Sequence, residues 1–480
     1  MPVRPLSLPV NRVIDVSVGS SGAWVGPGTR TGALGRRIAI TRDDPDIAHE
    51  LATRLKAQGH LAELVERPSG PAGMVVLTGG LRTDTPTRFH ARMLAEIQPL
   101  IPQLEAGEID LRMLQAPAGT DGQWCSGLGG LVRTLMREYP DHRSQVLSFS
   151  GLGSPTDAAL DRASACLISA AAPEDVTIAA DGSATVPIME TVAGLPGHGP
   201  NQSLVSASDV FVVTGGGQGI TAACTIALAQ RTGATMYLLG RSQPLPWPAE
   251  LDPAMPESEI RMTLAKAALA EGQRPRPADI AARTRKLVAG RSIQKTLSAI
   301  ETAGGRGAYF PVDLSDRAGV DACMGAIRQR GAPITGIIHG AGVLADQTVA
   351  TMTAEHVARV FAPKVEGLSH LLASCGGPTL RHVALFSSAA ARFGNRGQAN
   401  YAMANETLNQ VARALKSARP ELNVRSFDWG PWDGGMVSDS LKAAFAARGI
   451  DAIPLAEGAA VFAELMDGDP GAVEVCIGAV

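Results

Sequence analysis

Residues 209–242 read DVFVVTGGGQGITAACTIALAQRTGATMYLLGRS, and this stretch decides the fold. A short apolar run is followed by a glycine-rich turn, an alanine-rich helical run and a second apolar run. Glycines at such a turn let the backbone approach a pyrophosphate, while the N-terminus of the following helix faces the phosphate charge. The stretch therefore predicts a strand, a dinucleotide-binding turn, a helix and a second strand. The turn residues expected at the cofactor are Thr214, Gly215, Gly216, Gly217, Gly219 and Ile220.

The same alternation continues along the rest of the chain. Strand candidates follow in AYFPVDLSD, ITGIIHGAGVL, HVALFSSAA and LNVRSFDWGPW, with helical stretches between them. Six strands that alternate with helices predict one parallel sheet, with ligands at the carboxyl ends of its strands. Asp313 and Leu314 follow the third strand and are expected at the cofactor, with Asp313 at the adenine amino group. The small residues expected where the backbone passes the ribose are Gly340, Ala341 and Gly342.

The end of the second strand indicates which dinucleotide is preferred. A site that prefers NAD needs an acidic residue there, and this strand ends in Arg241 and Ser242 instead. A cation and a hydroxyl suit the 2′-phosphate of NADPH. The alternative for Arg241 is an ordinary surface ion pair. We therefore expect NADPH as the cofactor.

A further α/β unit precedes this one, in residues 36–205. RRIAITRDD reads as a strand, PDIAHELATRLKAQG as an amphipathic helix and MVVLTGG as a second strand. The turn after its first strand is TRDDPD, which is acidic where a pyrophosphate would lie. GLGGLVRTLMREYPDHRSQVLSFS adds a helix and a strand, and DVTIAADGSATVPIME reads as a hairpin that turns at Asp181 and Gly182. The unit is expected to be a truncated, structural Rossmann-like fold that binds no dinucleotide.

Two segments lie outside these units. Residues 1–35, rich in Gly, Ser, Pro and Val, are expected to be a flexible leader. Residues 243–293 alternate between proline-rich and helical stretches, and we expect them to form an insertion of two surface helices. A partner surface and a solvated decoration both stay open as its role. The predicted organisation is a leader, a structural unit at 36–205 and a catalytic unit at 206–480.

Composition excludes several classes of function. The 480 residues exceed one ordinary domain, and 45% hydrophobic against 19% charged residues permits a large core. A net charge of −3 gives no reason to expect a nucleic acid partner. The 6 cysteines form no C-x-x-C pair and no H-E-x-x-H motif occurs, so we expect no metal site. No apolar run is long enough to span a membrane, and we expect a cytoplasmic protein without a membrane partner.

Four polar residues of the second unit suggest proton-transfer chemistry. Tyr401 and Asn405 share one face of the helix predicted in GQANYAMANETLN (397–409). Ser388 ends the strand HVALFSSAA, thirteen residues before Tyr401, and Lys364 lies in a helical stretch upstream. Reduction of a ketone needs a proton at its oxygen, and a phenol exchanges one at neutral pH only when a nearby cation lowers its pKa. The alternative for Tyr401 is a packing role.

Each of the four residues then has an expected role. Tyr401 donates the proton, and Lys364 lowers the pKa of the Tyr401 phenol. Ser388 holds the carbonyl oxygen of the substrate. Asn405 holds a water that restores the proton of the phenol. No single residue would establish this mechanism, but the four residue types together match it.

Together these motifs resemble the short-chain dehydrogenase/reductase superfamily. The glycine turn, HGAG, Ser388 and Tyr401 provide the resemblance. Ordinary members have a lysine four residues after the tyrosine and an asparagine upstream. Here Asn405 and Lys364 are exchanged, as in the ketoreductase domains of type I polyketide synthases. GLGGLVRTLMREYP, HGAGVL, GNRGQANYAMAN and DWGPWDGGMV are similar to the same domains, and YAMANETLN and GGMV resemble those of polyunsaturated-fatty-acid and enediyne-type synthases.

This resemblance covers about residues 36–480 and implies a function. It implies NADPH-dependent reduction of a β-keto group to a β-hydroxy group on polyketide or fatty acyl chains bound to an acyl carrier protein, beside other synthase domains. Of the LDD motif that marks one product configuration, LAD (344–346) keeps only Asp346 of the acidic pair, and Phe393 replaces the tryptophan that marks the other. A D-hydroxy product is therefore expected. Two alternatives stay open, a catalytically silent structural domain of a synthase and a reductase of free small carbonyl compounds.

Overall fold

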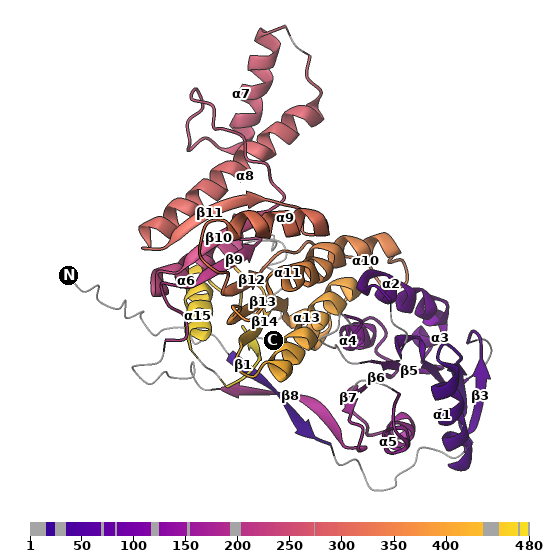
Figure 1. The fold of residues 1–480 in the computed structure, drawn as a ribbon. Coiled ribbons are helices and arrows are strands. Elements are labelled where there is room, and N and C mark those ends of the chain that lie inside the picture. The colour runs from indigo at the N-terminus through magenta and orange to yellow at the C-terminus, as the bar shows by residue number, and fades with distance from the viewer. Residues whose placement is uncertain are drawn as a thin grey trace.

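The computed structural model describes residues 16–24, 35–68, 72–81, 84–116, 124–150, 154–192, 203–272, 274–434, 451–468 and 471–478. Within these ranges the strands form one continuous sheet of 15 strands in the order β11-β10-β9-β12-β13-β14-β15-β1-β8-β7-β6-β5-β4-β2-β3. Two parallel sections of this sheet are joined by antiparallel strands in the middle. Figure 1 shows the two sections side by side, each with its own helices. The predicted α/β fold with two Rossmann-like parts is confirmed.

The section formed by the second half of the chain has the strand order of dinucleotide-binding folds. From β9 (Val210–Thr214) the chain moves outward to β10 and β11, then returns to β12 on the other side of β9. All neighbouring strands in this section are parallel. The winding therefore reverses between β9 and β12, and the carboxyl ends of these strands form the crevice where such folds bind ligands. The other strands are β10 (Thr235–Gly240), β11 (Arg306–Pro311), β12 (Gly336–His339), β13 (His382–Ser388), β14 (Asn423–Trp429) and β15 (Glu474–Ile477).

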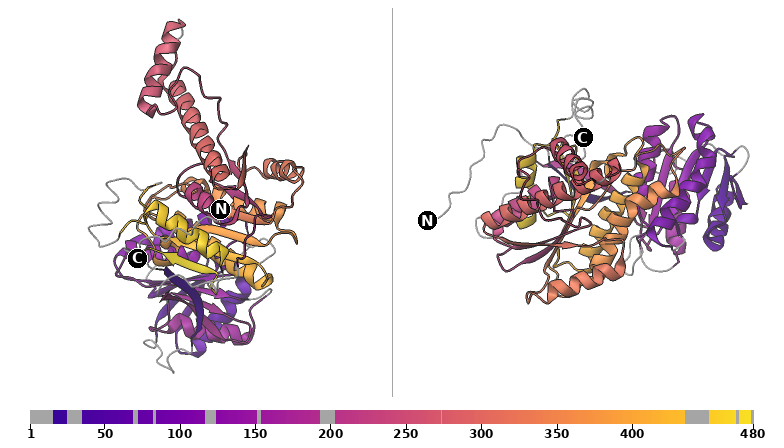
Figure 2. Two further views of the ribbon diagram at one scale, coloured as in Figure 1. Left: turned by 90° about the vertical axis from the view of Figure 1, so that its left-hand side faces the viewer. Right: turned by 90° about the horizontal axis from the view of Figure 1, so that it is seen from above.

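Helices connect these strands (Figure 2). The helix α6 begins directly after the glycine turn, and α13 begins at Ala399, which puts Tyr401 in its first turn. None of the helices within the described ranges is long and apolar enough to cross a membrane. The helices of this half are α6 (Gly219–Thr232), α9 (Arg317–Arg328), α10 (Ala354–Phe361), α11 (Gly367–Cys375), α12 (Ala389–Phe393), α13 (Ala399–Ala418) and α15 (Leu455–Asp467).

The first half of the chain forms the other parallel section. In the turn after its first parallel strand, where a phosphate would lie, the Asp44 carboxylate accepts a hydrogen bond from Ile47 N at 3.2 Å and caps α1. A carboxylate of the acidic turn TRDDPD therefore occupies the N-terminus of α1, the position at which a phosphate would bind. The strands are β2 (Arg37–Thr41), β3 (Leu61–Val65), β4 (Met74–Leu77), β5 (Asp110–Gln115), β6 (Ser144–Phe149) and β7 (Asp175–Ile178). The helices are α1 (Pro45–Ala57), α2 (Pro86–Ile97), α3 (Ile101–Glu105), α4 (Leu128–Glu138) and α5 (Asp157–Ile168).

Two strands join the halves. β1 (Val16–Ala23) pairs antiparallel with β15 on one side and with β8 (Ala184–Val192) on the other. β8 also pairs antiparallel with β7, as expected for a hairpin turning at Asp181 and Gly182. The expectation of a flexible leader over residues 1–35 is therefore wrong for residues 16–23. Backbone pairing on both sides fixes these residues although their sequence shows no regular apolar pattern.

Residues 243–293 form a helical hairpin that projects from the body of the protein (Figure 1). Its helices α7 (Glu257–Ala270) and α8 (Pro277–Thr302) pack on each other, and α8 also packs on α6 and β11. The two expected helices are present, but the second continues without a break through residue 293 into the helix expected at SIQKTLSAIETAGG. The hairpin thus continues directly from a helix that packs against the sheet at β11. Its own small core consists of Leu251, Ile260, Leu264, Ile280 and Leu287.

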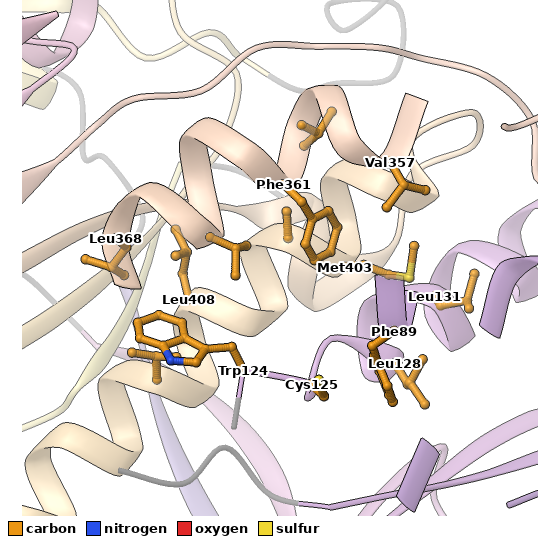
Figure 3. Close-up of a cluster of buried hydrophobic side chains, with 14 of the residues drawn as sticks. Phe89, Trp124, Cys125, Leu128, Leu131, Val357, Phe361, Leu368, Met403 and Leu408 are labelled. Atoms are coloured by element: carbon orange, nitrogen blue, oxygen red, sulfur yellow. The ribbon is translucent and has the colours of Figure 1, made fainter. Parts of the chain in front are cut away.

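The halves share a hydrophobic core (Figure 3). In this core α2 packs on α10 and α4 packs on α13, so the first half covers helices that surround the candidate site. The first half contributes Phe89, Trp124, Cys125, Leu128 and Leu131. The second half contributes Val357, Phe361, Leu368, Met403 and Leu408.

Candidate active site

The glycine turn joins β9 to α6 at the point where the winding of the sheet reverses. Gly215 has a φ of 74°, and a Cβ atom at this position would lie 2.7 Å from the carbonyl oxygen of Gly340. Both the left-handed backbone and the close approach therefore require glycine at position 215. The turn is thereby placed directly against the HGAG segment that follows β12.

A cavity of about 470 Å³ extends from the glycine turn along the carboxyl ends of the strands. Of the residues expected at the cofactor, those that line it are Gly215, Gly217, Arg241, Ser242, Asp313, Leu314, Ala341 and Gly342. The remaining expected residues are not part of the lining: Thr214, Gly216, Gly219, Ile220 and Gly340. The sequence did not indicate the other lining residues, which are Gln218, Leu239, Gly240, Ala289, Ile293, Tyr309, Val312, Val343 and Pro363.

Arg241 lies exposed at the carboxyl end of β10. Among the described residues it forms no hydrogen bond and no short ion pair, so an ordinary surface ion pair does not account for it. The pKa of Asp313 lies below its usual value because of hydrogen bonds with Ser315 and, to a smaller extent, because of the charge of Arg241. Tyr309 donates to the carbonyl oxygen of Ser242 at 2.8 Å and fixes the backbone next to Arg241. A cation is thus available at this end of the cavity.

Ser388, Tyr401 and Asn405 come together at the carboxyl end of β13. The Ser388 hydroxyl oxygen accepts a hydrogen bond from Ala390 N at 3.2 Å, so Ser388 ends the strand and caps α12. Asn405 lies one turn after Tyr401 on α13 and donates from Nδ2 to the Tyr401 carbonyl oxygen at 2.9 Å. Side-chain hydrogen bonds with Asn405 and Ser388 act on the Tyr401 phenol. The structure therefore brings these three side chains to one point.

Lys364 lies in a π-helical turn, Ala362–Glu366, between α10 and α11. Such turns occur frequently at functional sites. The buried Lys364 ammonium group donates to the Phe386 carbonyl oxygen at 2.7 Å and lies 5.6 Å from the centroid of the Tyr401 ring. Burial lowers the pKa of Lys364 to about 7, and the nearby Asp428 acts in the opposite direction. Lys364 can therefore gain and lose a proton near neutral pH.

A buried histidine connects the glycine turn to Lys364. His339 Nδ1 lies 2.9 Å from Thr214 Oγ1, and His339 Nε2 lies 2.8 Å from the carbonyl oxygen of Lys364. Because a carbonyl oxygen only accepts, Nε2 is assigned the proton and Nδ1 accepts from the Thr214 hydroxyl. Burial lowers the pKa of His339 to about 3, which keeps the imidazole neutral. Thr214 is therefore linked to the site through its hydrogen bond to His339, although it does not line the cavity.

The pKa of Tyr401 differs from the expectation. Burial raises it above its usual value, while the hydrogen bonds with Asn405 and Ser388 lower it. The Lys364 ammonium group bonds to Phe386 and lies over the Tyr401 ring, so its charge does not produce the lowered pKa expected from the sequence. Tyr401 is therefore protonated at neutral pH and able to donate.

The helix α8 supplies part of the cavity wall. Ala289 and Ile293 line the cavity, and Thr296 Oγ1 donates to the Gly217 carbonyl oxygen at 3.2 Å. A Cβ atom on Gly217 would lie 3.0 Å from Ile293 Cγ1, so the helix directly contacts the glycine turn. The insertion thus forms part of the site. Its interpretation as a solvated surface decoration does not account for this contact.

Comparisons with known proteins agree with these observations. Residues 210–434 match the family model for the KR domain. The chain is 35% identical over 289 residues to one component of a polyunsaturated fatty acid synthase from Thraustochytrium sp., a match that covers 58% of this chain and 10% of that protein. It is 36% identical over 161 residues to the polyketide synthase PksL of Bacillus subtilis, which covers 32% of this chain and 4% of that protein. The chain therefore spans a small fraction of the relatives it matches.

Solved structures share the fold of both halves. One is the ketoreductase from the first module of phoslactomycin biosynthesis in Streptomyces sp. HK803, with a TM-score of 0.69 and 19% identity, covering 98% of this chain and 94% of that chain. Another is an A-type ketoreductase of a modular polyketide synthase, with a TM-score of 0.72 and 21% identity, covering 96% and 92%. The two-part architecture is thus common to these proteins.

Proposed function

We propose that this chain reduces the β-keto group of an acyl thioester to a β-hydroxy group with NADPH. Residues 210–434 match the family model for the KR domain, and the similar proteins are synthases of polyketides and polyunsaturated fatty acids, which supports the proposal. The observation that most supports this proposal is the convergence of four side chains. They do not line the cavity of about 470 Å³, but Lys364 lies next to Gly342 in its wall. These side chains are Ser388, Tyr401, Asn405 and Lys364.

The four side chains have complementary roles in this reaction. When bound, NADPH supplies the hydride that reduces the β-carbon. The Tyr401 hydroxyl gives its proton to the ketone oxygen, and the Ser388 hydroxyl holds that oxygen in place. Lys364, with a pKa of about 7 and an ammonium group 5.6 Å from the centroid of the Tyr401 ring, can return a proton to the phenolate that remains. Asn405 supports the path by which solvent returns a proton to Tyr401.

The chemistry of the cavity fits NADPH. The glycine turn lies directly before the N-terminus of α6, and the backbone N–H groups there suit a pyrophosphate. Arg241 and Ser242 at the end of β10 suit a 2′-phosphate, and no acidic residue stands there to bind the ribose hydroxyls of NAD.

The substrate we propose is bound to an acyl carrier protein and yields a D-hydroxy product. The carrier protein follows from the relatives, which are synthases of polyketides and polyunsaturated fatty acids. The configuration follows from Asp346 and from the phenylalanine at 393, where a tryptophan would mark the opposite product.

One experiment tests this function and its alternatives. The purified protein is incubated with NADPH and a β-ketoacyl group, either on a carrier protein or as a free pantetheine thioester, and the product is separated on a chiral column. We expect one hydroxyacyl enantiomer of D configuration, formed faster from the carrier-bound substrate. No reduction of either substrate would favour a silent structural domain. A third incubation with a small free ketone tests the remaining alternative, and a rate equal to that of the carrier-bound substrate would favour a reductase of free carbonyl compounds.

A further inference from the structure

The helix α4 of the first half lies against the catalytic helix α13 at the residues that follow Tyr401. A Cβ atom on Gly130 would lie 2.4 Å from the carbonyl oxygen of Ala402, and one on Gly127 would lie 2.4 Å from that of Met403. The two helices therefore approach backbone to backbone, which only glycine permits. This contact aligns the side chains of the last turns of α4 with the loop that precedes α13.

Glu138, the last residue of α4, binds two separate backbone segments of the second half. One carboxylate oxygen accepts from Gly397 N at 2.9 Å and the other accepts from Val349 N at 2.9 Å. The side chain is buried, so water competes little for these bonds. Gly397 lies four residues before Tyr401, and Val349 lies three residues after Asp346.

Two arginines of α4 bind the end of α12, which precedes Gly397 in the chain. Arg133 Nε donates to the Ala391 carbonyl oxygen at 2.7 Å, and Arg137 Nε donates to the Phe393 carbonyl oxygen at 3.1 Å. Arg133 is itself fixed by buried ion pairs with Asp175 at 2.9 Å and with Glu406 of α13 at 2.7 Å. Residues 391–397 are thus held at three positions by side chains of the first half.

The segments that Glu138 connects also bond to each other. Gln347 N donates to the Gly397 carbonyl oxygen at 2.7 Å, and Gln398 Nε2 donates to Asp346 Oδ2 at 2.9 Å. Both segments lie next to Tyr401, so a shift in either changes how a ketone is presented to the phenol. A carboxylate that accepts two backbone N–H groups, one from each segment, fixes their separation.

We propose that α4 of the first half is a positioning element for the reaction, in which Glu138 and Arg137 set the geometry of the segment between Ser388 and Tyr401, which comprises α12 and the turn after it, and thereby the face of the ketone that is reduced. This inference rests on the proposed reductase function. It assigns to the first half a role in stereochemical selection in addition to its role in the shared core. Glu138 and Arg137 are positioning residues, because within the described part of the chain their hydrogen bonds go to backbone groups that border the site.

Three variants test this proposal. Glu138→Gln keeps the size of the side chain but replaces one acceptor oxygen by an N–H group that faces a backbone donor. Arg137→Ala removes one exposed bond to the last residue of α12 and leaves the core intact. Arg36→Ala is the matched control, because Arg36 bonds only within the first half, to Asp110 at 2.7 Å and to the Gly73 carbonyl oxygen. For each variant we would measure the product enantiomer ratio, kcat, the KM for NADPH, Tm and amide hydrogen exchange in residues 391–400.

We expect Glu138→Gln to lower kcat about tenfold, since a displacement of the reacting groups by a fraction of an ångström has effects on this scale. The minor enantiomer should increase, exchange in 391–400 should become faster, and the KM for NADPH should stay within about twofold. Arg137→Ala should change the enantiomer ratio and exchange in the same direction but less. Arg36→Ala should lower Tm only.

Two results would overturn the proposal. The first is an unchanged enantiomer ratio and unchanged exchange in both Glu138→Gln and Arg137→Ala; if Glu138→Gln does not fold, Arg137→Ala alone decides. The second is that all three variants lose activity only in proportion to their unfolded fraction. If the wild-type protein reduces no ketone, the proposed function fails, and the exchange measurement still decides whether α4 fixes the loop.

Discussion

Lys364 combines nearly complete burial with a position over the Tyr401 ring. Its pKa in the folded protein is about 7, against 10.5 for an ordinary lysine. Between these values the folded protein has lost the proton while the unfolded chain keeps it. Unfolding therefore takes up a proton, and the stability of the protein increases as pH rises from about 7 toward 10.5.

Lys364→Met removes this titration. Between pH 7 and pH 9 the free energy of unfolding of the wild-type protein should rise by about 2 kcal/mol relative to that of Lys364→Met, because all other titrating groups are common to both. Urea denaturation of both proteins at the two pH values measures the difference. Parallel changes in both proteins would show that Lys364 does not release its proton in the folded state. The variant should also lose most of its reductase activity.

Arg241 decides the choice of cofactor in this account. Arg241→Ala should raise the Kd for NADPH by roughly tenfold to a hundredfold, the scale of one hydrogen bond to a charged group, and leave the Kd for NADH nearly unchanged. Fluorescence titration with both dinucleotides measures this. Arg306→Ala, at the opposite end of the neighbouring strand β11, is the control. If Arg241→Ala raised the Kd for NADPH and the Kd for NADH by the same factor, Arg241 would have a structural role and would not bind the 2′-phosphate.

At the residue scale, much of the site could be predicted from spacing. Tyr401 and Asn405 share a helix face, and Ser388 ends a strand, so local periodicity places them. The raised pKa of Tyr401 could not be predicted, because it depends on burial and on the direction of the Lys364 side chain. The bonds of Glu138 to Val349 and Gly397 could not be predicted either, because their partners lie more than two hundred residues away.

At the scale of elements, α8 shows the limit of local signals. Its proline-rich start and a glycine at position 290 read as breaks, yet the helix runs unbroken over Pro277–Thr302. Proline is tolerated in the first turn of a helix, and packing on α6, α7 and β11 outweighs the low helix propensity of the glycine. The contact of α8 with the glycine turn follows from this continuity.

The contact between Gly217 and Ile293 provides a test of α8. Gly217→Ala should raise the Kd for NADPH about tenfold, because the added methyl group must displace the turn or the helix. Ile293→Ala should make room for that methyl group, so the double variant should bind NADPH better than the two separate effects predict. Gly325→Ala on α9, where a Cβ atom meets nothing within 4 Å, is the control. If the effects of Gly217→Ala and Ile293→Ala on the Kd for NADPH were additive, α8 would not support the glycine turn.

At the scale of the whole molecule, the two halves are joined more closely than the sequence indicates. β1 completes a continuous sheet between β15 and β8, although residues 16–23 show no regular apolar pattern. Its place depends on two strands that lie far along the chain, β8 at residues 184–192 and β15 at residues 474–477, and sequence reasoning over a local window does not find such pairings. The alternation of strands and helices, which is local, correctly predicted the two Rossmann-like parts.

Separation of the halves tests this joint core. A chain that lacks residues 1 to about 200 should aggregate, since it exposes the faces of α10 and α13 and leaves β15 as an open edge. Coexpression of the two halves should restore soluble, active protein. NADPH oxidation in the soluble fraction of each expression measures this. A soluble, monomeric and fully active second half on its own would refute the account of the interface.

The central claim is that Tyr401 protonates a β-ketone while NADPH reduces it. The most direct measurement uses NADPH deuterated at the hydride-donating carbon with a β-ketoacyl thioester, and locates the label in the product by mass spectrometry and NMR. We predict one deuterium on the β-carbon of the hydroxyacyl product. In Tyr401→Phe the rate should fall by about two orders of magnitude or more, the usual scale for a general acid, with a nearly unchanged Kd for NADPH. Absence of the label from the β-carbon, or a Tyr401→Phe rate above about a tenth of wild type, would contradict the claim.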